Sequence, residues 1–279
     1  WPICRVWPTS PSRSSPLRLH EPRPDPRVSD SLGFVAALAG AAFLTSTLSG
    51  VAGLGGGTVL IGLFYAIGLA PVEAIPLFAA VQLASNASRM TAYVRHVEWK
   101  ATGWFLLASV PATFLLAPWV QHVDLHWTQL LLAALILASM LPSADSGASK
   151  LPEPMLFSVA GLLNGSLGLF VGATGLFVGR LFLRPGWRKE TTIGTLALTQ
   201  MLGHLLRVLA YGFAGFSAFA NPHVLLPLCA AVIAGTITGR RLHAHLDERQ
   251  FALLFKGLLI ALSLKLLWDG VSGLLRVGG

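Results

Sequence analysis

The chain has 279 residues, of which 54% are hydrophobic and 11% are charged. Its mean hydropathy is +0.67, and a single soluble core does not need this much apolar sequence, so the composition predicts a polytopic membrane protein in a lipid bilayer. The formal net charge is +8, but Lys and Arg gather in an N-terminal tail and in short loops between apolar segments. That distribution is typical of topology signals, and we expect no nucleic-acid partner.

The first 31 residues differ in composition from the rest of the chain. They are rich in Pro, Ser and Arg and have no apolar periodicity, so we expect a disordered or misassigned N-terminal tail over residues 1–31. The two cysteines, Cys4 and Cys229, provide neither a disulfide framework nor a cysteine metal site. We expect no cofactor and no metal.

From Leu32 onward, apolar segments alternate with short polar breaks. The second and seventh segments are shorter than the roughly 20 residues that a straight membrane crossing needs, which favours half-helices or re-entrant segments there. We therefore predict an all-α polytopic membrane protein with about 8–10 transmembrane helices and Gly-rich helix breaks. The predicted segments are 32–50, 54–69, 74–93, 101–120, 126–142, 155–170, 171–184, 191–214, 223–239 and 251–268.

Two of these segments carry the same polar stripe. The spacing i, i+4, i+7, i+11 places all four residues of a stripe on one helical face. An arginine inside a membrane span costs roughly 3 kcal/mol or more unless it meets protein, water or an anion, so the matched arginines predict a site. The stripes are Gln82, Asn86, Arg89 and Tyr93 and, 118 positions later, Gln200, His204, Arg207 and Tyr211.

A glycine-rich turn precedes each stripe, at positions 50–57 and 165–172. Three glycine pairs match at an offset of 115, so the second copy is expected to carry about three extra residues, which we place in the loop at 184–189. The chain is therefore predicted to be a duplicated half. We expect a first transmembrane repeat over 32–142, a linker over 143–154, a second repeat over 155–270 and a C-terminal tail over 271–279.

The loop charges predict opposite directions for the two stripe helices. Arg95 and Lys100 follow the first stripe, whereas Arg184 and Lys189 precede the second. By the positive-inside rule, the end of the first helix and the start of the second lie on the same side of the membrane. This arrangement favours an inverted repeat, in which transporters place their substrate site near the midplane between the repeats.

The stripes and turns together offer what an oxyanion site needs: a cation, several N–H or O–H donors, and backbone that can be approached closely. Other roles stay open: glycines often serve close helix packing, an arginine can pair with a carboxylate or cap backbone carbonyls, and His204 can carry a proton or join two helices. The candidate substrate-binding residues are Gln82, Asn86, Arg89, Gln200, His204, Arg207, Gly55, Gly56, Gly57, Gly172, Thr174 and Gly175.

Two further residues are expected to have ordinary membrane roles. Tyr211, like Tyr93, ends its stripe near a predicted interface, where tyrosine usually anchors a helix in the aromatic belt. Arg180 lies only four residues before Arg184, so we expect its side chain to reach the inner membrane surface.

The glycine turn at 53–57, the Gln82/Asn86/Arg89 helix with the loop at 95–100, and the turn at 172–175 resemble the sulfite exporter TauE/SafE family. The resemblance extends over roughly residues 33–270. It implies a secondary permease or exporter of sulfite, organosulfonates or related small anions, working by alternating access and open to proton coupling. We expect it to reside in the inner membrane of a bacterium as a multi-pass protein, with its oligomeric state left open.

An alternative function from another class remains open. The chain could be a membrane-embedded enzyme or assembly factor that handles an anionic lipid or a sulfur intermediate and uses the arginines for binding. No nucleophile–base pair or paired carboxylates are visible in the apolar segments, so we expect a transporter and not an enzyme.

Overall fold

The computed structural model describes residues 32–52, 55–141, 151–242 and 248–277. Within these ranges all regular secondary structure is helical, which confirms the predicted all-α class. The predicted tail at 1–31 and most of the predicted linker at 143–154 lie outside the described residues.

The described α-helices follow the ten predicted segments in order. The first half contains α2 (Leu32–Ala52), α3 (Gly56–Ala66), α4 (Pro71–Tyr93), η1 (Val94–His96), α5 (Trp99–Leu116), η2 (Ala117–His122) and α6 (Leu125–Met140). The second half contains α7 (Glu153–Val171), α8 (Gly175–Gly179), η4 (Arg180–Phe182), α9 (Lys189–Phe213), α10 (Pro222–Leu242) and α11 (Glu248–Val277).

The C-terminal helix is longer than the sequence predicted. The expected end of the second repeat at residue 270 falls inside α11, which continues to Val277. Gly270 does not break this helix but brings it close to α6, because a Cβ there would lie 2.7 Å from the side chain of Leu130. The glycine is a packing position and not a helix end.

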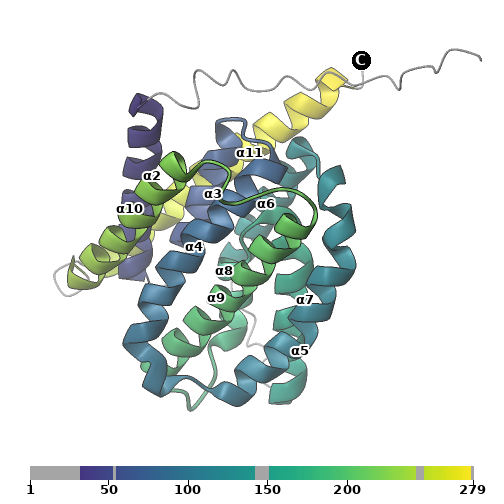
Figure 1. Ribbon diagram of the computed structural model, residues 1–279. Coiled ribbons are helices and arrows are strands. Elements are labelled where there is room, and N and C mark those ends of the chain that lie inside the picture. The colour runs from purple at the N-terminus through teal and green to yellow at the C-terminus, as the bar shows by residue number, and fades with distance from the viewer. Residues whose placement is uncertain (1–31, 53–54, 142–150, 243–247, 278–279) are drawn as a thin grey trace, which may run out of the picture.

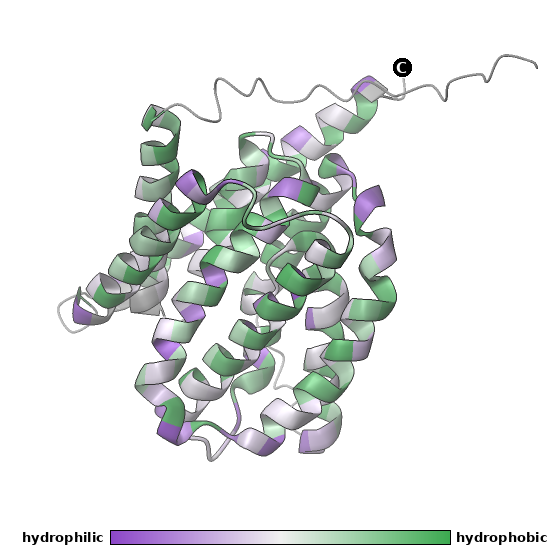
Figure 2. Ribbon diagram, viewed as in Figure 1, coloured by the Kyte–Doolittle hydropathy of each residue, from purple (hydrophilic) through white to green (hydrophobic). Residues whose placement is uncertain are grey.

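The outer surface of the bundle is suited to lipid. Six described helices are long and apolar enough to cross a membrane, and α4 has 23 residues but carries the polar stripe. The most exposed side chains include apolar ones, such as Leu115 at 77%, Phe213 at 78% and Leu254 at 75%. Figure 2 shows hydrophobic residues over most of the helices. The chain is therefore a multi-pass membrane protein.

The two halves interlace. α2 packs along α10, α5 packs along α7, α4 crosses α9 in the middle of the bundle, and α6 packs against α11 (Figure 1). In chain order, α2 to α6 of the first half correspond to α7 to α11 of the second. The α2–α10 pair therefore corresponds to the α7–α5 pair, and the α4–α9 and α6–α11 pairs each join two corresponding helices. Each half thus supplies the packing partners of the other, so neither half buries its own apolar faces alone.

The stripe helices α4 and α9 run antiparallel. A Cβ on Gly194, near the start of α9, would lie 2.8 Å from the carbonyl oxygen of Tyr93, the last residue of α4. Further along, the rings of Phe78 and His204 meet edge to face with centroids 5.4 Å apart. This direction agrees with the one that the loop charges predict, and it sets the two stripes opposite each other.

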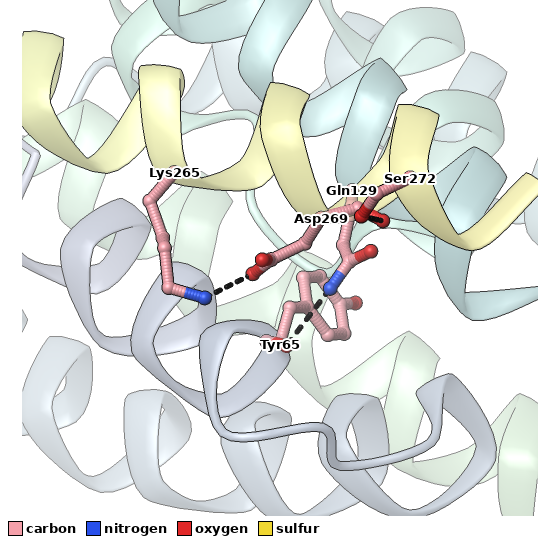
Figure 3. A network of polar contacts seen from close by, with 5 residues as sticks. All are labelled: Tyr65, Gln129, Lys265, Asp269 and Ser272. Carbon is pink, nitrogen blue, oxygen red and sulfur yellow. Dashed lines mark hydrogen bonds and ion pairs between the residues drawn. The ribbon is translucent and has the colours of Figure 1, made fainter.

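The two short helices occupy equivalent places in the halves. α3 has 11 residues and α8 has 5, followed by the 3₁₀ turn η4. Figure 3 shows how the end of α3 is satisfied: Gln129 of α6 donates from Nε2 to the carbonyl oxygen of Tyr65 at 3.0 Å. The Tyr65 hydroxyl in turn donates to the carbonyl oxygen of Val171 at 2.9 Å. These bonds hold α3 to both halves. An ion pair on α11, between Lys265 and Asp269, lies nearby in the same view.

Candidate functional site

Arg207, the arginine of the second stripe, is buried, with 1% of its surface exposed. Its Nη2 atom donates to Asn164 Oδ1 at 2.7 Å and to the Asn164 carbonyl oxygen at 3.2 Å. Its Nε atom has no hydrogen-bond partner, and no carboxylate in the described residues forms an ion pair with it. The guanidinium therefore caps a carbonyl and keeps one donor available for a further acceptor.

His204 lies one turn before Arg207 and is bonded to it. Arg207 Nη1 is 2.9 Å from His204 Nδ1. Because a guanidinium can only donate, Nδ1 must accept, which places the ring proton on Nε2. The hydrogen bond thus lies within α9, and the contact of His204 across to α4 is the aromatic one with Phe78.

Asn164 of α7 connects Arg207 to the turn before α8. Its Oδ1 atom also accepts from the hydroxyl of Thr174, the N-cap residue of α8, at 3.0 Å. Gly203 leaves room for the Asn164 amide, because a Cβ there would overlap Nδ2. Sequence reasoning missed Asn164. The 115-residue glycine offset could have found it, since it pairs Asn164 with Ser49.

The first stripe is built in a related way but is less buried. Arg89 is half-buried, and its Nη2 atom donates to Ser49 Oγ of α2 at 3.1 Å. Asn86 and Gln82 are buried, and Asn86 Nδ2 donates to the Gln82 carbonyl oxygen at 2.9 Å. Arg89 and Ser49 thus occupy the positions that match Arg207 and Asn164 in the second half.

In each half, one glycine of the turn lies next to the glutamine of the stripe. A Cβ on Gly57 would lie 2.9 Å from Gln82 Nε2, and a Cβ on Gly175 would lie 3.9 Å from Gln200 Oε1. Both pairs are 25 positions apart. This equal spacing favours the turn before Gly175 as the place of the three extra residues, whereas the sequence placed them in the loop at 184–189.

The remaining predicted glycines serve the backbone and packing. Gly55 caps α3 with φ of +98°, and Gly172 follows α7 with φ of +87°, both in the left-handed region that favours glycine. A Cβ on Gly56 would overlap the carbonyl oxygen of Thr45, and one on Gly172 would lie 3.1 Å from the side chain of Ile61. The structure therefore supports a packing role for these glycines rather than contact with an anion.

A cavity of about 570 Å³ brings residues of the two stripes together. Asn86 and Arg89 line it from α4, and Gln200 lines it from α9. The amide Nε2 of Gln200 is buried and has no hydrogen-bond partner. Lys189 adds positive charge at the start of α9, and Arg184 lines the cavity while its Nη2 atom lies 3.7 Å from Glu153 Oε1. The cavity therefore presents cations and the unpartnered amide of Gln200, which suits an anion.

The role expected for Tyr211 is wrong. Tyr211 is fully buried and donates from its hydroxyl to the carbonyl oxygen of Leu169 at 3.0 Å, because α9 is enclosed by the interlaced halves.

Arg180 caps the end of α6. It donates to the carbonyl oxygens of Ser139 at 3.1 Å and Leu141 at 2.8 Å. Its expected reach to the inner membrane surface stays a prediction.

A family model described as "Sulfite exporter TauE/SafE" matches residues 38–266. The chain belongs to the TauE/SafE family. The matched region includes both stripes, both glycine turns and the cavity. No curated protein and no solved structure matches the chain.

The TauE/SafE family is a family of membrane transporters of sulfur-containing anions, which agrees with the expectation of a transporter and not an enzyme. The six long apolar helices agree with a multi-pass transporter.

Proposed function

We propose that the protein is a secondary transporter that exports sulfite or an organosulfonate through the space between α4 and α9. The observation that carries this proposal is the cavity that places Arg89 and Asn86 of the first stripe beside Gln200 of the second. Both halves then contribute to one anion site.

The electrostatics of the cavity support an oxyanion. Arg89 supplies a charge and several N–H donors, and Asn86 and Gln200 supply neutral donors. Lys189 lies nearer the loop and raises the local concentration of anions before they reach Arg89. Within the described lining of this cavity there is no carboxylate to repel the anion.

The path continues beyond the cavity along the same face of α9. His204 and Arg207 follow Gln200 at i+4 and i+7, where the structure is closed and Arg207 is held by Asn164. In this proposal the two halves are inverted repeats that exchange roles. Access then alternates when the Arg89 side closes and the Arg207 side opens.

In this proposal the cavity faces the cytoplasmic side of the inner membrane of a bacterium. Lys100 and Lys189 are exposed at the end of the bundle where α5 and α9 begin, Lys189 also lines the cavity, and the positive-inside rule assigns such basic loops to the cytoplasm. The substrate would then enter the cavity from inside the cell, as export requires.

The test is the flux of radiolabelled sulfite from proteoliposomes containing wild-type protein, Arg89→Gln or Arg207→Gln. We expect both variants to lose flux, because glutamine removes the charge and most of the donors. Arg95→Gln is the matched control, since Arg95 is exposed and does not line the cavity. Normal flux in both stripe variants would show that the stripes are structural.

The same assay tests proton coupling and the choice of substrate. An imposed proton gradient accelerates flux if protons are co-transported or exchanged, and leaves the rate unchanged if the anion moves by facilitated diffusion. A panel of sulfonates replaces sulfite if wild-type protein moves no sulfite. Failure with every anion would contradict the proposed function.

A further inference from the structure

The cavity is far larger than sulfite requires. Its volume of about 570 Å³ falls within the roughly 300–1,000 Å³ of sites for organic ligands. From Lys189 to Gln200 its lining follows α9 over a rise of about 16 Å. An ion as small as sulfite would occupy only the end beside Arg89.

The lining is divided into a polar end and an apolar wall. Asn86, Arg89 and Gln200 form the polar end. Apolar residues form a wall beside this end, and Arg184, Lys189 and Thr192 line the cavity with them. The apolar residues are Leu183, Pro185 and Trp187 before α9 and Ile193, Leu196 and Ala197 on α9.

The apolar wall is a fixed surface. The ring of Trp187 stacks on Phe157 of α7, with centroids 5.5 Å apart and planes 14° from parallel. Leu196 and Ala197 are buried at 5% and 2% exposure. An apolar group that enters here meets side chains that are already positioned, so little ordering is needed when it binds.

We infer that the preferred substrate is an organosulfonate with an apolar tail, whose sulfonate group lies at Arg89 and whose tail lies along Trp187 and Leu196. This inference rests on the proposed function and specifies its substrate class. A bare sulfite ion satisfies the polar end but leaves the apolar wall in contact with water, whereas a tailed sulfonate removes that surface from water.

The experiment measures binding and flux separately. Binding of methanesulfonate, butanesulfonate and hexanesulfonate to purified protein is followed by calorimetry in nanodiscs of zwitterionic lipid. We expect affinity to rise with tail length by up to about fourfold per methylene, the equivalent of ~0.8 kcal/mol for a buried methylene. The same sulfonates should compete with labelled sulfite flux in the same order.

Two variants locate the tail. Trp187→Ala should flatten the dependence on tail length while leaving methanesulfonate affinity within about twofold of wild type. Leu183→Ser repeats the test at a residue that is 63% exposed and is not needed for packing. Trp104→Ala is the control, because Trp104 is an exposed tryptophan that does not line the cavity.

The outcomes separate this inference from the proposed function. Equal affinity for all three sulfonates, with sulfite flux that Arg89→Gln abolishes, would overturn the tailed substrate and leave anion transport intact. Tail-dependent binding that Trp187→Ala removes, without flux of any anion, would support the tail site and contradict transport. Loss of hexanesulfonate binding when phosphatidylglycerol is added would identify a lipid site and overturn the inference.

Discussion

The Nη2 atom of Arg207 donates to Asn164 Oδ1 at 2.7 Å, and the matching Arg89 donates to Ser49 Oγ at 3.1 Å. Each bond joins a stripe helix to the first helix of its own half. The asparagine offers a side-chain oxygen and a carbonyl to Arg207, whereas the serine offers a single hydroxyl to Arg89. The two arginines are therefore held differently: one is sealed, and the other borders the cavity.

Asn164→Ala is expected to destabilise the protein by about 2 kcal/mol, because a buried hydrogen bond to a charged group is worth roughly 1.5–3 kcal/mol. Thr174 loses its acceptor in the same variant. Ser49→Ala should cost less, since Arg89 is only half-buried. Thermal unfolding of the two variants in detergent checks the order, and equal melting temperatures would contradict it.

Gly168→Ala is expected to displace the Arg207 side chain, because a Cβ at this position would overlap Nη2. The variant should lose both folded yield and thermal stability. Gly212→Ala lies on the same helix as Arg207 and faces open space, so it should stabilise α9 by about 0.5–1 kcal/mol. Unfolding curves that shift in the same direction for both variants would argue against this prediction.

Gly57→Ala is expected to slow transport with little loss of stability. The added methyl group would lie 2.9 Å from Gln82 Nε2, and the flexible end of the glutamine can move away. Gly175→Ala leaves 3.9 Å to Gln200 and should transport at close to the wild-type rate. Sulfite flux, normalised to reconstituted protein, compares the two variants, and a greater loss of flux in Gly175→Ala would contradict this prediction.

Cysteine labelling tests the proposed orientation in a background with Cys4→Ala and Cys229→Ala. Lys100→Cys and Lys189→Cys replace exposed residues at one end of the bundle. We expect both to be protected from an impermeant maleimide in intact cells. His122→Cys and Ser217→Cys lie after α5 and α9, at the opposite end, and should be labelled. The reverse pattern would place the cavity outside.

Much of the fold could be predicted from segment length and hydropathy. The ten predicted segments correspond to the described α-helices. The second and seventh segments, predicted to be too short for a straight crossing, became α3 and α8, the two shortest α-helices in the described residues. The periodic stripes likewise predicted that Gln82, Asn86 and Arg89 share a face with access to a site, and Asn86 and Arg89 line the cavity.

The errors concern residues whose environment comes from distant segments. Tyr211 was predicted to lie in the aromatic belt, but α7 covers it and supplies its acceptor at Leu169. The carbonyl oxygens at the end of α6 that Arg180 caps were likewise not predicted. Asn164 was not predicted, because a single polar residue in an apolar helix has no helical periodicity and its match to Ser49 at the 115-residue offset was not used.

The sequence by itself determined the membrane environment, the helical segments and the two polar faces, because hydropathy and helical period depend on residues close together in the chain. Only the tertiary structure decided that the halves interlace, that Arg207 is sealed by Asn164 while Arg89 borders a cavity, and that Trp187 faces the same cavity as Gln200. These relationships depend on contacts between segments far apart in the chain, which packing across the whole bundle fixes and no local pattern records.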